Sequence, residues 1–235
     1  MSIYIFRFFS VLFFGSILLA ACSKVNNSIE TVAAESRDGA AASKPDAAPT
    51  PKSAAKGEQN AVFAGGCFWG LEAVFEHIKG VGDVESGYSG GAAKTADYET
   101  VSGGETGHAE SVKITFDPSQ VSYEQLLKVF FAVAHNPTEL NRQTPDTGTQ
   151  YRSAIFYSSD EQKRLAENYI AELTKEKTFP KPIVTQVVAL DAFYKAEDYH
   201  QNYLAHHPNQ AYIVAYDQPK VENLRKQFPD LYVSK

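Results

Sequence analysis

The chain has 235 residues and a formal net charge of −6 at pH 7, with 22 Lys and Arg against 28 Asp and Glu. Its basic residues are scattered, whereas a surface that binds phosphates needs clustered positive charge, so the composition argues against a nucleic-acid partner. Two cysteines are too few for a disulfide framework.

Residues 1–21 are predicted to be an export signal. Arg7 precedes an apolar stretch from Phe8 to Leu19, and small residues then lead to Cys22. The segment Leu19-Ala20-Ala21-Cys22 resembles the lipobox of bacterial lipoproteins, in which the cysteine is lipidated and becomes the new N-terminus. The alternative is an uncleaved N-terminal membrane anchor. We therefore expect a protein of the bacterial cell envelope, lipid-anchored to a membrane with its folded part outside the cytoplasm. Ser23 favours the outer membrane by analogy with such lipoproteins.

Residues 22–58 are predicted to be a disordered tether, rich in Ala, Ser, Lys and Pro and poor in large apolar residues. Residues 59–235 are long enough for one domain with its own core. After processing, this domain holds a single thiol, Cys67, so it has no internal disulfide and its stability must come from packing.

Cys67 lies between the short apolar run Ala61–Ala64 and a helical pattern of apolar residues from Leu71 to Ile78. This spacing predicts a thiol at a helix N-terminus, where unpaired N–H groups and the helix dipole favour an anion. We therefore expect a thiolate near neutral pH. The alternative is that Cys67 is a small buried apolar residue, as free cysteines usually are.

The next stretch, Val81 to Gly107, is rich in glycine and is predicted to be mostly loop. From His108 to Phe116 the residues alternate in character, which predicts a strand whose apolar face also carries Glu110. Burial on an apolar face penalises the charged form of a carboxyl and raises its pKa. Glu110 is therefore a candidate proton donor at neutral pH.

The remaining elements alternate between helices and strands. Capping boxes, Ser122 with Gln125 and Ser159 with Gln162, each predict a helix start. Further elements are expected as strands at Ser153–Tyr157 and Ile183–Leu190 and as a helix at Ala196–His206. The order predicts a mixed class with two layers, helices packed on a small sheet joined by long loops, and leaves the strand order open.

The candidate site residues suit one type of reaction. A nucleophile, an acid, hydroxyl donors and an aromatic pocket fit attack on a polar, oxygen-bearing centre attached to an apolar group. These groups are Cys67, Glu110, Tyr98, Tyr151 near Asp146, and the aromatic pair Phe68 and Trp69. The six histidines are scattered without ligand spacing, so we expect no metal site and no cofactor.

Six segments of the chain together resemble the peptide methionine sulfoxide reductase A family. The resemblance extends from Val62 to the region of Phe228. The segments are Gly65-Gly66-Cys67-Phe68-Trp69-Gly70, Gly87-Tyr88-Ser89-Gly90-Gly91, Tyr98-Glu99-Thr100-Val101, Thr106-Gly107-His108-Ala109-Glu110, Gly148-Thr149-Gln150-Tyr151-Arg152-Ser153 and Glu197-Asp198-Tyr199-His200-Gln201.

The resemblance implies an α+β fold, a two-layer sandwich with a ferredoxin-like core, and a reaction. Methionine S-sulfoxide, free or in proteins, would be reduced to methionine with formation of a Cys67 sulfenic acid, which repairs oxidised proteins. The implied roles are attack on the sulfoxide sulfur by Cys67, proton donation by Glu110, hydrogen bonds to the oxygen from Tyr98 and Tyr151, methyl binding by Phe68 and Trp69, and substrate orientation by Asp146.

The chain departs from many family members at two places. Those members carry resolving cysteines near the C-terminus, whereas Ala211 to Lys235 contains none. We therefore expect a thioredoxin-like protein or a small thiol to attack oxidised Cys67 directly. Asn136 stands where the family commonly has an acid, which puts a charged role of this position in doubt. A monomer is expected.

Two alternatives remain. A cysteine protease would also need a thiolate, with His108 or His200 as its base. A lipid-anchored binding module would carry an inert thiol. A thioredoxin-like enzyme is disfavoured because the chain lacks a Cys-x-x-Cys motif.

Overall fold

The computed structural model describes residues 57–235. The predicted export signal, Cys22 and nearly all of the predicted tether lie outside the described residues, so these assignments stay predictions. Within residues 57–235, no helix is both long enough and apolar enough to cross a membrane.

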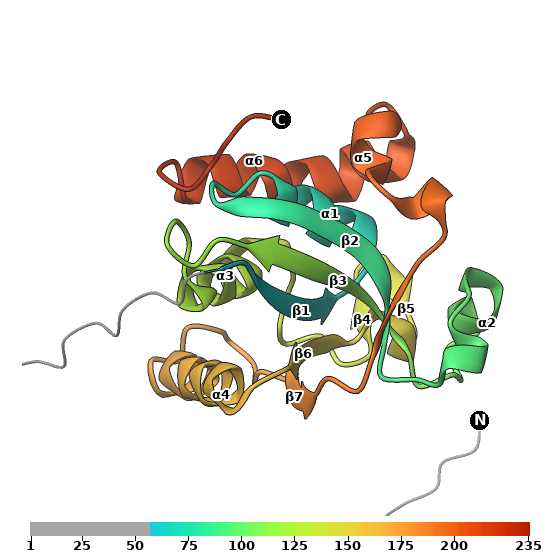
Figure 1. Ribbon diagram of the computed structural model, residues 1–235, viewed down its shortest axis with the longest axis horizontal. Helices are drawn as coiled ribbons and strands as arrows, with labels where there is room; N and C mark the ends of the chain where they lie inside the picture. The colour runs from blue at the N-terminus through green and yellow to red at the C-terminus, as the bar shows by residue number, and fades with distance from the viewer. Residues whose placement is uncertain (1–56) are drawn as a thin grey trace, which may run out of the picture. The chain divides into compact units, whose positions relative to one another are not determined.

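A mixed six-stranded sheet forms the centre of the fold (Figure 1). Neighbouring strands are antiparallel, except for one parallel pair, β6 with β7, at one edge. The strands in spatial order are β7 (Gln186–Ala189), β6 (Ser153–Tyr157), β1 (Gln59–Gly65), β3 (Ala109–Phe116), β2 (Val81–Ser89) and β8 (Phe193–Lys195).

The four central strands and two helices confirm the ferredoxin-like core. Along the chain the order is β1, α1 (Phe68–Glu76), β2, β3, α3 (Tyr123–Val129) and β6. In the sheet these strands lie in the order β6-β1-β3-β2, all antiparallel, which is the topology of a split β-α-β unit. The antiparallel register places the end of β1, which precedes Cys67, beside the start of β3, which carries Glu110.

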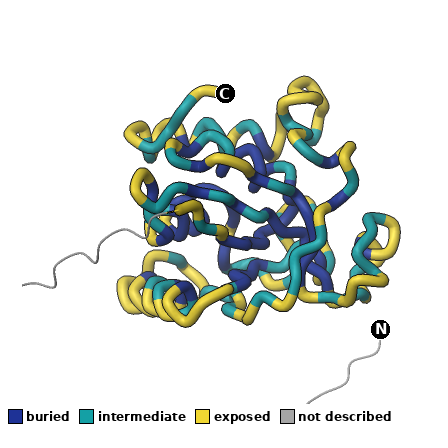
Figure 2. Tube along the Cα trace, viewed as in Figure 1, coloured by how far each residue is buried: buried dark blue, intermediate teal, exposed yellow. Residues whose placement is uncertain are grey.

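Large aromatic residues fill the layer between the sheet and the helices. The Phe63 ring from β1 lies 5.6 Å from Phe75 of α1 and 4.9 Å from Phe130, measured between centroids. Burying each such side chain stabilises the fold by about 1.5–3 kcal/mol. Figure 2 shows the buried residues concentrated along the central strands, with exposed residues on α4 (Asp160–Lys175) and α6 (Gln218–Gln227). The site described below therefore lies on a rigid support.

The prediction that Val81 to Gly107 is mostly loop is wrong for its first third. Residues 81–89 form β2, which pairs with β3 on one side and β8 on the other. A Cβ at Gly87 would lie 2.4 Å from the Phe193 ring, so this glycine serves the close approach of β8 rather than a turn. The later part contains the short helix α2 (Tyr98–Ser102).

One predicted capping box is complete and the other is half formed. At the start of α3, Ser122 and Gln125 make both reciprocal hydrogen bonds. At the start of α4, Ser159 accepts the N–H of Gln162, but the Gln162 side chain bonds elsewhere. It accepts the N–H of Ser158 and donates to the carbonyl of Asn60, and so ties α4 to β1.

The predicted helix Ala196–His206 is broken in the structure. A short 3-10 turn at Asp198–His200 and the helix α5 (Tyr203–His206) are separated by Asn202, whose φ is 53°. The predicted strand Ile183–Leu190 is shorter, as β7, and the sequence analysis missed β8 and α6. At this break the backbone N–H groups of Asn202 and Tyr203 hydrogen-bond to the buried carboxyl of Glu72 in α1.

Burial raises the pKa of Glu72 from 4.5 to about 7, and the N–H groups of Asn202 and Tyr203 offset this only in part. Above about pH 4.5 the carboxyl ionises in the unfolded chain but stays protonated in the folded one, which favours unfolding. The contribution of Glu72 to the free energy of unfolding is therefore complete below about pH 4.5 and is lost as pH rises to about 7. We expect this loss to be on the order of 3 kcal/mol in the free energy of unfolding.

Glu72→Gln should reduce that pH dependence, because glutamine does not titrate. Urea unfolding of the two proteins at several pH values between about 4.5 and 7 measures the effect. Glu124→Gln, at an exposed position of α3, serves as the control and should retain the wild-type slope. An undiminished slope in Glu72→Gln would show that Glu72 is not the titrating group.

Candidate active site

Cys67 lies at the junction of β1 and α1. Gly66 has a φ of 99°, which favours glycine, and a Cβ there would lie 2.6 Å from the Gln143 side chain. After this turn, Cys67 lies at the N-cap position of α1 and is only 8% exposed. The predicted placement at a helix start is thus confirmed.

A cavity of about 200 Å³ opens on the Cys67 side chain. The structure brings together in its wall every predicted site residue of the described part of the chain, and adds one tyrosine that the sequence analysis missed. The lining residues are Cys67, Phe68, Trp69, Tyr98, Glu110, Asp146, Tyr151 and Tyr212. Their shared location agrees with a single site, while their individual roles stay predictions.

Glu110 is the buried carboxyl of this cavity. It projects from β3, is 3% exposed, and its Oε2 accepts the N–H of Phe68 over 3.1 Å. Burial raises the pKa of Glu110 to about 8, with smaller contributions from the charges of Asp146 and Asp217, whereas the Phe68 N–H lowers it. Most of this carboxyl is therefore protonated at neutral pH and can donate a hydrogen bond or a proton.

The expectation of a resting thiolate is wrong. Burial raises the pKa of Cys67 well above its usual value, and the negative charges of Glu110 and Asp217 raise it further. The N–H of Trp69 at the helix start lowers the pKa, but this is a smaller effect. Desolvation outweighs the helix N-terminus here, so the free protein holds Cys67 as a neutral thiol.

The phenol groups of Tyr98 and Tyr151 line the same cavity as Glu110. Burial raises the pKa values of Tyr98 and Tyr151, and nearby Glu110 adds to both shifts. Both hydroxyls are therefore protonated donors at neutral pH. Tyr212, from the C-terminal segment, donates a hydrogen bond to Asp146 Oδ2 and so links the last part of the chain to this wall.

The aromatic wall is held by residues without a predicted role. The Trp69 Nε1 donates to His200 Nδ1 over 3.1 Å, and its ring stacks on Tyr203 at 3.7 Å between centroids. Glu197 accepts hydrogen bonds from the Tyr88 hydroxyl and from the Tyr98 N–H, each 2.9 Å long. Glu197 and His200 belong to the last segment of the family resemblance, so a signal for them was present in the sequence.

The two histidines considered as a protease base each use ring nitrogens in other hydrogen bonds. The His108 ring accepts the N–H of Gly91 and contacts the Ala92 carbonyl through its other nitrogen. The His200 Nδ1 accepts the Trp69 N–H. Among residues 57–235, no group of three or more His, Cys, Asp or Glu side chains is arranged to hold a metal ion. The geometry thus favours acid-assisted chemistry at Cys67 over base-assisted proteolysis.

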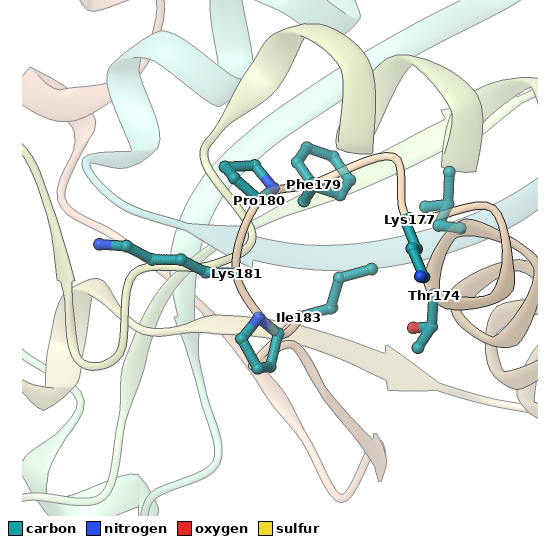
Figure 3. Close-up of a pocket in the computed structure, with 8 residues that line it drawn as sticks. Thr174, Lys177, Phe179, Pro180, Lys181 and Ile183 are labelled. Atoms are coloured by element: carbon teal, nitrogen blue, oxygen red, sulfur yellow. The ribbon is translucent and has the colours of Figure 1, made fainter.

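A larger hollow of about 430 Å³ lies between the end of α4 and the loop that leads to β7 (Figure 3). Its lining contains no thiol and no carboxyl. The residues are Leu173, Thr174, Lys177, Phe179, Pro180, Lys181, Pro182 and Ile183. This hollow is larger than the Cys67 cavity, but its side chains cannot supply the nucleophile and the acid found around Cys67.

Residues 59–232 match the family described as peptide methionine sulfoxide reductase. The chain is 58% identical over 182 residues to peptide methionine sulfoxide reductase MsrA 2 of Mesorhizobium japonicum, covering 77% of this chain and 93% of that protein. It is 52% identical to MsrA of Deinococcus radiodurans, covering 74% and 84%.

Two solved structures resemble the fold. Reduced Mxr1 from Saccharomyces cerevisiae gives a TM-score of 0.59 at 32% identity, covering 65% of this chain and 87% of that one. Methionine sulfoxide reductase A of Corynebacterium diphtheriae gives a TM-score of 0.58 at 33% identity, covering 66% and 77%. Both similarities support the α+β architecture described above.

Proposed function

The chain belongs to the peptide methionine sulfoxide reductase family, and from this premise we propose that it reduces methionine S-sulfoxide, free or in proteins, to methionine. One observation carries the proposal. The only thiol among residues 57–235 and a buried, largely protonated carboxyl line the same small cavity, together with an aromatic wall. A protein with this activity repairs oxidised proteins.

The sulfoxide oxygen is a poor leaving group until it accepts a proton. Glu110 supplies that proton, and the hydroxyls of Tyr98 and Tyr151 donate hydrogen bonds to the same oxygen. The Cys67 sulfur bonds to the substrate sulfur as the sulfur–oxygen bond breaks. The thiol loses its proton in the same step, and the oxygen leaves as water. Water then attacks the Cys67 sulfur and gives up a proton, and the sulfur–sulfur bond breaks with its electron pair going to the substrate sulfur. In net terms, a thiol and a sulfoxide become a sulfenic acid and a thioether, and Glu110 is reprotonated.

The aromatic wall binds the methyl group that is attached to the sulfoxide sulfur. Trp69 and Phe68 present apolar ring surface inside the cavity, where a methyl group gains from leaving water. Asp146, held by the Tyr212 hydroxyl, lines the same cavity and orients the substrate. A cavity of about 200 Å³ holds a methyl sulfoxide group and leaves the rest of a peptide outside.

Return of the sulfenic acid to the thiol needs an external reductant. Cys67 is the only free cysteine among the described residues, so those residues offer no partner for an internal disulfide. A thioredoxin-like protein or a small thiol attacks the Cys67 sulfur and releases water, and a second thiol breaks the mixed disulfide. Each turnover therefore consumes two thiols.

The location of the protein is part of the proposal and rests on the sequence. Lipidation at Cys22 would anchor a monomeric enzyme to a membrane of the bacterial envelope and leave residues 59–235 free to reach oxidised proteins. The tether predicted for residues 22–58 gives that reach.

A mass-spectrometric assay tests the activity. A peptide with methionine S-sulfoxide loses the mass of one oxygen atom when it is reduced. We expect each protein chain to reduce many such peptides when dithiothreitol is present, and at most one when it is absent. The R epimer serves as the control substrate and should stay oxidised. Persistence of the S-sulfoxide in the presence of dithiol would refute the proposed function.

A further inference from the structure

A buried ion pair lies beside the active site without lining its cavity. The Lys220 Nζ donates to Asp217 Oδ1 over 3.1 Å, and the Asp217 side chain is 0% exposed. The second carboxylate oxygen, Oδ2, has no hydrogen-bond partner among residues 57–235. Desolvating two charges is costly, and their mutual attraction often fails to offset it. A buried pair of this kind is therefore weak evidence for stability, which leaves room for another role.

The pair is packed on the helix turn that begins with Cys67. A Cβ added at Gly70 would lie 2.2 Å from Asp217 Oδ1 and 2.6 Å from Lys220 Nζ. Gly70 is three residues after Cys67, in the first turn of α1. The side chains of Asp217 and Lys220 thus occupy the space that a side chain at position 70 would fill. They bring a charge pair to the start of the helix.

We propose that Asp217, anchored by Lys220, is a positioning residue for Cys67: it packs on the first turn of α1 through Gly70 and brings a negative charge to the helix start that carries the thiol. The inference rests on Cys67 as the nucleophile.

The charges around Cys67 agree with this role. The ionisable groups that face the thiol are Glu110 from β3, Asp217 and Lys220 from the C-terminal segment, and the phenols of Tyr98, Tyr151 and Tyr212. Glu110 is largely protonated at neutral pH, as described above. Asp217 raises the pKa of Cys67 more than Lys220 lowers it. Asp217 therefore supplies the negative charge that opposes thiolate formation when Glu110 is neutral.

The rate of Cys67 alkylation by iodoacetamide as a function of pH tests this inference on the full chain. Mass spectrometry of the peptide that contains Cys67 separates its reaction from that of Cys22. We expect Asp217→Asn to move the midpoint of the profile to lower pH by about one unit, because one nearby like charge is removed. Removing both charges, in Asp217→Asn with Lys220→Gln, should give a smaller shift in the same direction.

Glu222→Gln removes an exposed carboxylate from the same helix and should leave the midpoint unchanged. Gly70→Ala provides a second route if Asp217→Asn does not fold. Alanine is favourable in a helix, and its Cβ displaces both charged groups, so the expected shift matches that of the double variant. A folded Asp217→Asn or Gly70→Ala protein with the wild-type midpoint would overturn the inference. Since alkylation requires no sulfoxide, that result would leave the proposed reaction untouched.

Discussion

Glu110→Gln is expected to lower the rate of sulfoxide reduction about 100- to 10,000-fold, the usual contribution of general acid catalysis. Glutamine has nearly the same shape, and its carbonyl can still accept the Phe68 N–H, so the fold and the cavity should persist. It cannot supply a proton to the departing oxygen. Rapid-quench measurement of a single turnover, without reductant, isolates this step from recycling. Glu110→Ala should nearly abolish turnover for the same reason.

The pH dependence of the same step identifies the acid. Glu110 has a pKa of about 8 and must be protonated to act, so the wild-type rate should be level at neutral pH and fall as pH rises through about 8. This fall should vanish in Glu110→Gln. Glu167→Gln, at an exposed position of α4, is the matched control and should keep the wild-type rate and profile. Wild-type single turnover in Glu110→Gln would rule out Glu110 as the proton donor.

Cys67→Ser is expected to abolish reduction in both single and multiple turnovers. A hydroxyl keeps the size of the side chain but is a far weaker nucleophile than a thiol. Cys22→Ser should retain wild-type single turnover, because Cys22 precedes the domain and has no proposed part in the reaction. Mass spectrometry of the sulfoxide peptide measures both variants. Residual reduction by Cys67→Ser at the wild-type rate would mean that another group attacks the substrate.

Local sequence patterns predicted much of the site. Alternation in β3 correctly placed Glu110 on a buried face. The apolar run before Cys67 and the helical pattern after it correctly indicated a thiol at a helix start. Both features depend on neighbours within a few residues. Strand order depends on pairing between distant segments, and only the family resemblance indicated it.

The errors came from contacts between distant parts of the chain. A helix start favours a thiolate when considered alone, yet the surroundings that keep Cys67 neutral include Glu110 on another strand and Asp217, 150 positions farther along the chain. Gly87 suggested a loop because the crossing of Phe193 was unknown. Tyr212 and Asp217 lie in a C-terminal segment without a recognised motif, so neither could be placed at the site in advance.

In the proposed reaction, oxygen leaves the substrate as Cys67 is oxidised to a sulfenic acid. One turnover with an S-sulfoxide peptide, in the presence of the sulfenic acid trap dimedone and without a thiol, tests it directly. We expect each chain to yield one reduced peptide and one dimedone adduct on Cys67, and both to be absent in Cys67→Ser. Reduction of the peptide with Cys67 still an unmodified thiol would contradict it.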